Sequence, residues 1–263
     1  MIRNRWRQAL ATGRTQIGMW VVGASPYSAE ICAGAGLDWL LIDQEHAPND
    51  LRSTLSQLQA VSGYPVEVLV RPPSADPVLI KQLLDLGVTD LVVPMIESAA
   101  AAQAVVAATR YPPAGIRGVG SAFARASRWN RISDYLTTAD SSISVTVQIE
   151  SAAGLAELDK IAGVEGVDAV FIGPADLAAS LGYLGKPQAP PVVEVIEEAL
   201  RTLHGAGVAA GVNAFDPATA RRYIAAGASF VLVGADVTLL ARGAEALAQA
   251  YRNDIQFPTP HNI

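Results

Sequence analysis

Residues 143–176 read ISVTVQIESAAGLAELDKIAGVEGVDAVFIGPAD, and they contain one strand, one helix and a second strand in succession. The runs 143–151 and 167–176 are nearly continuous in apolar residues. This pattern is typical of strands that are buried on both faces of a parallel sheet. The stretch therefore predicts a βαβ unit, and its repetition along the chain decides the fold class.

Six further runs have the same character, and most of them precede a segment with helical spacing. They lie at 15–23, 38–46, 66–73, 90–97, 208–216 and 230–236. Eight strand–helix units predict an α/β protein, a (β/α)8 TIM barrel of parallel strands, as a single domain over 1–263. The alternative is a doubly wound open sheet, but no Gly-x-Gly-x-x-Gly turn follows the first strand.

Three segments lie outside the repeat. Residues 1–10 are expected to form an amphipathic N-terminal helix. Residues 115–142 make a long insertion between the fourth and fifth strands, and insertions of this length are usually functional or interfacial. The tail, 255–263, has two prolines and no periodicity, so we expect it to be poorly ordered or docked elsewhere.

The composition excludes several classes of protein. The chain is 51% hydrophobic and 17% charged, which excludes global disorder. A net charge of −6 argues against a nucleic-acid-binding protein, which needs a basic face. No apolar run is long enough to span a membrane. The single cysteine, Cys32, and the absence of a signal-peptide core favour a cytoplasmic protein.

Polar side chains follow several of the predicted strands, at the end of the barrel where such folds carry their chemistry. An ionisable group after an apolar run loses hydration unless it is paired or binds an ion. Functional use is therefore favoured over a simple strand-end salt bridge. The residues so placed are Asp43, His46, Arg71, Gln148, Glu150 and Asp176.

Glu150 and Asp176 follow neighbouring strands, so both carboxylates can converge on one point. Two carboxylates without a nearby His or Cys suit a hard divalent cation, Mg²⁺ or Mn²⁺, completed by water and substrate oxygens. The alternative is a pair of solvated acids at the starts of loops.

His46 is the one histidine of three that follows a predicted strand, which favours general acid–base use over a structural hydrogen bond. Arg71 could hold an enolate oxygen or form a salt bridge. The backbone of Gly173, Pro174 and Ala175 begins a helix and could receive a carboxylate. The three lysines, at 81, 160 and 186, fall in helices or a loop, so none is placed to form a Schiff base inside the barrel.

Four motifs carry a family resemblance: 40–50 (LLIDQEHAPND), 110–130 (RYPPAGIRGVGSAFARASRWN), 147–151 (VQIES) and 171–182 (FIGPADLAASLG). In this order the sequence resembles the 4-hydroxy-2-oxoheptane-1,7-dioate aldolase and 2-dehydro-3-deoxyglucarate aldolase family from about residue 18 to 252. The resemblance implies a class II aldolase that cleaves a 4-hydroxy-2-keto acid to pyruvate or hydroxypyruvate and an aldehyde, through a metal-stabilised enolate. It also implies a homo-oligomer, a hexamer arranged as a trimer of dimers, with exchanged C-terminal helices.

The resemblance also implies residue roles. A divalent metal (Mg²⁺, Mn²⁺ or Co²⁺) is held by Glu150 and Asp176, and catalysis uses His46 and Arg71. The keto acid's carboxylate meets the backbone around Ala175, with Gln148 nearby. Asp85 supports the histidine, unless it is an ordinary surface acid, and Asp43 is a second candidate for tuning it. Gln44 departs from the small residue that the family more often has there.

Two other functions stay open at this point. The first is a lyase for a CoA thioester, for which Arg117, Arg125, Arg128 and Arg131 in the insertion could bind phosphates; interface salt bridges are the preferred interpretation of these arginines. The second is a non-catalytic sensor that binds a keto acid and a metal. A pure sensor could dispense with an acid–base group, so His46 argues against it.

Overall fold

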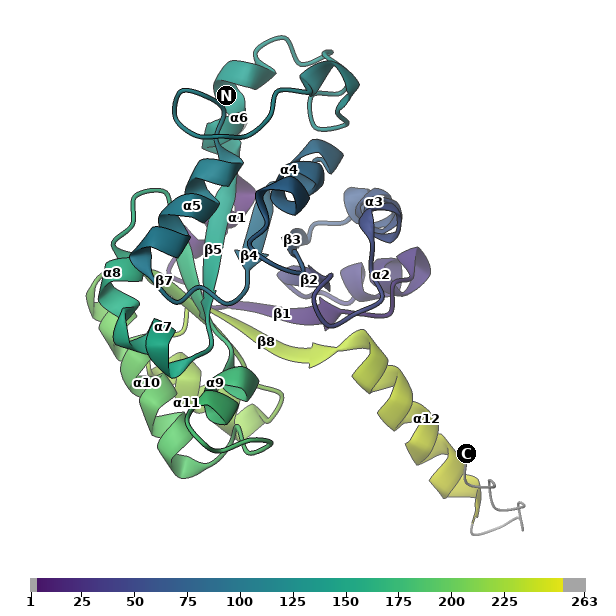
Figure 1. The fold of residues 1–263 in the computed structure, drawn as a ribbon. Helices are drawn as coiled ribbons and strands as arrows, with labels where there is room; N and C mark the ends of the chain where they lie inside the picture. Colours follow the sequence, from purple (N-terminus) through teal and green to yellow (C-terminus); the bar gives the residue numbers. More distant parts are fainter. Residues whose placement is uncertain (1–3, 253–263) are drawn as a thin grey trace.

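The computed structural model describes residues 4–252 and shows eight parallel strands closed into a barrel, with helices outside (Figure 1). Each strand pairs with its neighbours in sequence, and β8 pairs with β1. The predicted (β/α)8 TIM barrel is confirmed. The strands are β1 Gln16–Val21, β2 Trp39–Asp43, β3 Glu67–Arg71, β4 Asp90–Val93, β5 Ser144–Ile149, β6 Ala169–Ile172, β7 Ala209–Asn213 and β8 Phe230–Ala235.

The helices run antiparallel to the strands on the outside of the barrel, and many have side-chain caps at their N-termini. Asp50, for example, makes a capping box with Ser53 at the start of α3. The helices are α1 Arg5–Ala11, α2 Pro26–Ala33, α3 Leu51–Ala60, α4 Pro77–Leu86, α5 Ala99–Thr109, α6 Tyr135–Ser142, α7 Ala152–Ala156, α8 Leu158–Ala162, α9 Pro174–Ser180, α10 Pro190–Gly205, α11 Pro217–Ala225 and α12 Asp236–Arg252. Two 3₁₀ turns, η1 Val61–Gly63 and η2 Ser121–Phe123, complete the set.

Large aromatic side chains fill the end of the barrel at which the strands begin. Trp6 of α1 packs against Trp39 and Phe230, with ring centroids 5.2 and 5.3 Å away. A Cβ at Gly211 would overlap the Phe230 ring, so glycine makes room for this packing. The N-terminal helix thus closes the floor of the barrel, and ligands must enter at the opposite end, which we call the mouth.

The long segment between α5 and β5 lies at the floor. Helices of a (β/α)8 barrel start at the mouth and end at the floor, so Leu86, the last residue of α4, is near the floor. Arg125 of the long segment donates a hydrogen bond to the Leu86 carbonyl at 2.8 Å. Arg117 is buried there and pairs with Asp85 at 2.9 Å. The predicted insertion is therefore remote from the mouth.

The last helix, α12, extends away from the barrel (Figure 1). Its first residue, Asp236, is anchored by the backbone N–H groups of Val22 and Gly23, at 2.9 and 3.1 Å. Further along, Leu239 and Leu240 are 63% and 76% exposed. Within the described part of the chain, no helix is long and apolar enough to cross a membrane. The predicted tail, 255–263, lies outside the described residues.

Candidate active site

The mouth of the barrel is lined by the last inward-facing residues of several strands. Side chains alternate between the barrel interior and the surrounding helices. Leu41, Leu69 and Phe171 belong to the interior cluster, so residues two positions further along each strand face the same interior at the mouth. This arrangement brings together Asp43, Arg71 and Gly173.

Arg71 is held rigidly by two acids and one aromatic ring. Its Nε and Nη2 donate to the two carboxylate oxygens of Asp43 at 2.7 and 2.8 Å, and its Nη1 lies 2.8 Å from Glu45 Oε2. The guanidinium carbon is 4.3 Å from the centre of the Trp20 ring. Because a guanidinium has five N–H donors, two remain after these three contacts. Arg71 can therefore donate to a ligand without leaving Asp43.

Glu150 directly follows β5 and is 3% exposed. Its Oε1 accepts a hydrogen bond from the Met95 backbone N–H at 2.8 Å, and its Oε2 accepts one from Gln148 Nε2. Burial raises the pKa of Glu150, and the negative charges of Glu45 and Asp176 raise it further, although the bonds from Met95 and Gln148 oppose this. The carboxyl is thus buried among acids.

Glu45, Glu150 and Asp176 concentrate negative charge at the mouth. Burial is the main cause that raises the pKa of Glu45, and Asp43 and Asp176 add to it, while Arg71 and His46 counteract it. The side-chain Oε1 of Gln148 is buried and has no hydrogen-bond partner among the described residues. Buried acids beside an unpartnered carbonyl oxygen form an oxygen-rich site that fits a hard divalent cation.

The protein side chains alone do not enclose such a cation. Residues 4–252 contain no group of three or more His, Cys, Asp or Glu side chains arranged to hold a metal ion. Two carboxylates would leave most positions of an octahedral ion for water and substrate oxygens. This is the usual arrangement for Mg²⁺, which keeps several of its waters.

Gly173 makes room for Glu150 and Gln148. A Cβ on Gly173 would lie 2.7 Å from Glu150 Oε2 and 2.9 Å from Gln148 Nε2, closer than real Cβ atoms approach. The following Pro174 begins α9, which places Asp176 in its first turn. The sequence Gly173–Asp176 therefore brings a backbone segment and one carboxylate against Glu150.

His46 lies in the loop after β2, which ends at Asp43, three residues earlier than the predicted strand. Its side chain is 65% exposed, and its Nε2 is 3.8 Å from Glu45 Oε2. Its backbone N–H donates to Asp43 Oδ2 at 3.2 Å. Asp43 therefore orients both Arg71 and the backbone that carries His46.

Asp85 is not brought to this site. It lies one residue from the floor end of α4, a helix of 10 residues, so it is separated from the mouth by most of the helix length, roughly 13 Å. Its carboxylate pairs with Arg117, and no contact with His46 occurs among the described residues. The predicted support of His46 by Asp85 therefore does not occur within one protomer.

The comparisons with known proteins agree with this geometry. A model of the HpcH/HpaI aldolase/citrate lyase family matches residues 16–243. The chain belongs to this family. The chain is 61% identical over 252 residues to the hydroxypyruvate/pyruvate aldolase of Deinococcus radiodurans, covering 96% of this chain and 91% of that protein.

Two further members of the HpcH/HpaI family are also similar. The 4-hydroxy-2-oxo-heptane-1,7-dioate aldolase of Salmonella dublin is 55% identical over 250 residues, which cover 95% of each chain. A crystal structure of a family protein from Burkholderia cenocepacia superposes with a TM-score of 0.90 at 42% identity, covering 95% of this chain and 99% of that one. The predicted family is confirmed, and the protein is an aldolase, a carbon–carbon lyase.

The CoA-lyase alternative is not favoured by the structure. Arg117 is 1% exposed and its guanidinium carbon is 4.5 Å from the centre of the Tyr111 ring. Arg131 stacks on Trp129 in the same floor segment. These arginines lie at the end of the barrel opposite Glu150, so they do not form a phosphate site beside the mouth.

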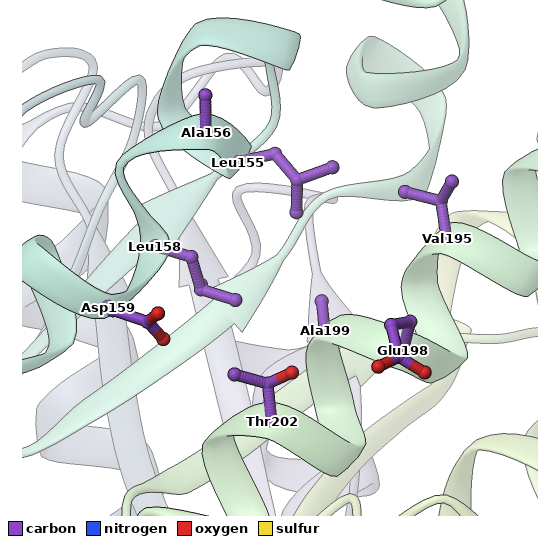
Figure 2. A pocket seen from close by; sticks show the side chains of 8 residues that line it. All are labelled: Leu155, Ala156, Leu158, Asp159, Val195, Glu198, Ala199 and Thr202. Atoms are coloured by element: carbon purple, nitrogen blue, oxygen red, sulfur yellow. The ribbon is translucent and has the colours of Figure 1, made fainter.

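A hollow of about 370 Å³ lies outside the barrel, between α7, α8 and α10. Figure 2 shows Leu155, Leu158 and Val195 around it. None of the predicted site residues lines this hollow, and neither does a histidine or an arginine. It is a groove between outer helices and is separate from the candidate active site at the mouth.

Sequence reasoning missed four residues of the mouth: Trp20, Glu45, Met95, and Asn213, whose side-chain oxygen accepts a hydrogen bond from Trp20 Nε1. Glu45 stands inside the quoted 40–50 motif, and its place beside a strand end was a usable signal. Met95 has a φ of 56°, a left-handed conformation that is uncommon for a side chain other than glycine. This backbone geometry, which aims the Met95 N–H at Glu150, has no signature in the sequence.

Proposed function

We propose that this protein is a class II aldolase that reversibly cleaves a 4-hydroxy-2-keto acid to pyruvate or hydroxypyruvate and an aldehyde. The observation that carries the proposal is the burial of Glu150 beside Glu45 and Asp176 at the barrel mouth, next to a fixed arginine. The names of the Deinococcus and Salmonella relatives support the reaction class.

Glu150 and Asp176 would hold the divalent cation, with Mg²⁺, Mn²⁺ or Co²⁺ as candidates, because both supply hard oxygen ligands. Once bound, the cation would polarise the 2-keto oxygen and share the charge of the enolate. Gln148 keeps the Glu150 carboxylate in place through its amide. The substrate's carboxylate would accept hydrogen bonds from the backbone N–H groups of Ala175 and Asp176 in the first turn of α9, because Pro174 has no N–H and that of Gly173 donates to the Ile149 carbonyl.

Arg71 and His46 have different tasks. Arg71 would donate its two free N–H groups to the keto oxygen as negative charge develops there, and Asp43 fixes the guanidinium for this role. His46, exposed above the mouth, would take the proton from the 4-hydroxyl group when the C3–C4 bond breaks. The aldehyde leaves, and C3 of the remaining enolate then takes up a proton.

The decisive experiment follows the C3 protons of pyruvate in D₂O by NMR, without any aldehyde. We expect exchange with Mg²⁺, Mn²⁺ or Co²⁺ and none in EDTA, because enolate formation needs the cation. Full exchange in EDTA would contradict the class II mechanism. Binding without exchange would indicate a sensor, and faster turnover of malyl-CoA than of a free hydroxy-keto acid would indicate a CoA lyase.

We further propose that the protein is a homo-oligomer in which α12 packs on a neighbouring copy, as in the predicted trimer of dimers. Leu240 on α12 and Tyr27 on α2 are 76% and 74% exposed, so both helices leave apolar surface uncovered. In such an assembly Asp85 could support His46 only from another subunit, because the two lie at opposite ends of one barrel.

Leu240→Glu tests this arrangement. The charge should disfavour burial of α12 against a neighbour, giving a smaller particle by analytical ultracentrifugation and a loss of activity. Glu245→Ala, on the same helix at a polar position, is the matched control and should leave the particle size unchanged. A monomeric wild-type protein with full activity would contradict the proposal.

A further inference from the structure

One pair of mouth residues has no part in the proposed reaction. Trp20, on β1, donates a hydrogen bond from its indole Nε1 to Asn213 Oδ1 on β7, at 3.0 Å. Trp20 also packs on Phe171, with ring centroids 6.3 Å apart, in the barrel interior. The pair therefore lies inside the mouth and joins β1, which is opposite β5 in the barrel, to β7, which is two strands from β5.

The hydrogen bond fixes which way the Asn213 amide points. An indole N–H can only donate, so the oxygen of the amide must face Trp20 and the NH₂ group must face away from it. Within residues 4–252 this NH₂ group donates to no acceptor. Asn213 is half-buried and lines a cavity of about 250 Å³ together with Pro174 and Ala175. Asn213 thus offers a fixed and unused hydrogen-bond donor close to Ala175, whose backbone is proposed to bind the substrate's carboxylate.

Trp20 connects this donor to the reacting end of the substrate. Its ring lies 4.3 Å from the Arg71 guanidinium, which is proposed to contact the keto oxygen. C3 of a keto acid is bonded to the same carbon as the keto oxygen. With that oxygen at Arg71, C3 would lie within reach of Trp20 and of the Asn213 amide that Trp20 holds.

We infer that Asn213 determines the preference for the donor keto acid, by donating a hydrogen bond from its side-chain NH₂ to a hydroxyl group on C3. The site then favours hydroxypyruvate over pyruvate, which has no such hydroxyl. This inference rests on the proposed function. Asn213 is a specificity residue and takes no part in proton transfer. An alternative role, in which Asn213 only positions Trp20 and hence Arg71, makes a different prediction, because it would affect both donors equally.

The test compares the two donors by isothermal titration calorimetry with Mg²⁺ present, and by the rate of C3 proton exchange in D₂O. In Asn213→Leu, which has similar volume and no donor, we expect the preference for hydroxypyruvate over pyruvate to fall about tenfold in dissociation constant. The dissociation constant for pyruvate should stay within about twofold. Asn213→Ala provides a second variant in case leucine disturbs the fold, and thermal melts check both.

Gln188→Leu is the matched control. Gln188 carries the same amide and lines the same cavity, but it is placed on the loop after α9, away from Trp20, so its removal should leave the donor ratio unchanged. Trp20→Phe should reduce the ratio in part, because the Asn213 amide loses the partner that fixes its orientation.

The outcomes separate the inference from the proposed function. If the wild-type protein exchanges the C3 protons and Asn213→Leu weakens both donors equally, the positioning role is correct and the inference is overturned. An unchanged ratio in both Asn213 variants would overturn it as well. If the wild-type protein exchanges neither donor with any divalent ion, the proposed function fails and the inference fails with it.

Discussion

Two buried carboxyl groups, Asp90 and Glu150, lie at opposite ends of neighbouring strands and have different surroundings. Asp90 begins β4 at the floor, where one oxygen accepts from Asn4 Nδ2 at 2.7 Å and the other from Thr89 Oγ1 at 2.6 Å. Glu150 follows β5 at the mouth, beside two more acids, Glu45 and Asp176.

The difference separates a structural acid from a functional one. Both oxygens of Asp90 have neutral donors, and the group links α1 to the barrel, so its surroundings are complete without a ligand. Glu150 also has two donors, but it adds to negative charge that the protein does not balance locally. Buried like charges raise one another's free energy, and a bound cation relieves this. Burial alone would not have distinguished the two groups.

The largest expected effect comes from Glu150→Gln. We expect a loss of about 10³-fold in turnover, since a catalytic cation contributes several kcal/mol to lowering the reaction barrier. The fold should persist, because Gln148 can turn its amide to bond the new side chain; its Oε1 has no partner to lose among the described residues. Asp90→Asn, which removes a buried carboxylate at the other end, should retain activity. Equal losses in both variants would invalidate the distinction between the two acids.

A smaller effect is expected from Arg71→Lys, which tests whether the fixed guanidinium beside Glu45 takes part in the reaction. Lysine keeps the positive charge but cannot contact Asp43 with two nitrogens and Glu45 with a third. Turnover should fall about 10²-fold, as for loss of one oxyanion donor, with the melting temperature changed by only a few degrees.

Arg14→Lys is the matched control for this substitution. Arg14 also contacts one aspartate, Asp38, with two nitrogens, at 3.1 and 2.6 Å, but its side chain is 64% exposed and outside the mouth. Its kinetics should equal those of the wild type. If both lysine variants are fully active, the bidentate geometry of Arg71 has no role in the reaction.

The sequence was sufficient for the barrel because its strands are continuous apolar runs, and such runs in series leave few other folds. It was less accurate at strand ends: β4 stops at Val93 rather than at residue 97, since the backbone turns to bring the Met95 N–H to Glu150. That turn depends on a partner 55 residues away in the chain, which periodicity does not reveal.

Some residues of the candidate site could be predicted from the sequence and others could not, depending on how clearly each one marks the end of an apolar strand. Glu150, Asp176 and Arg71 could be selected because each is polar at the end of an apolar strand. Asn213 also lies at the end of a strand, β7, but an uncharged amide in that position is a weak indication of function. Asp85 lies near the floor end of a helix, and whether it reaches His46 depends on the assembly, which one chain's pattern does not contain.

The smallest effect on turnover is expected in Asp90→Asn, which tests the floor of the barrel through stability instead. Burial raises the pKa of Asp90 to about 7, against bonds from Thr89 and Asn4 that lower it. Between about pH 4 and pH 7 the folded protein therefore keeps a proton that the unfolded chain releases, so this group's contribution to stability falls as the pH rises. The asparagine of the variant has no such proton to lose. The free energy of unfolding of the variant, relative to that of the wild type, should therefore rise from about pH 4 to pH 8, by an amount on the order of a few kcal/mol.

Urea unfolding at about pH 4.5, 6 and 8 measures this gain. Asp38→Asn is the opposite control: although burial raises the pKa of Asp38, bonds from Arg14 and from the Ile17 N–H outweigh it and lower the pKa. Its contribution is therefore present above about pH 4 and is lost on acidification, so Asp38→Asn should cost stability at about pH 8 and less at low pH. If Asp90→Asn is destabilising at the highest pH, the carboxylate is stabilised by its donors more than burial penalises it. In that case only the neighbouring acids, Glu45 and Asp176, would distinguish the surroundings of Glu150 from those of Asp90.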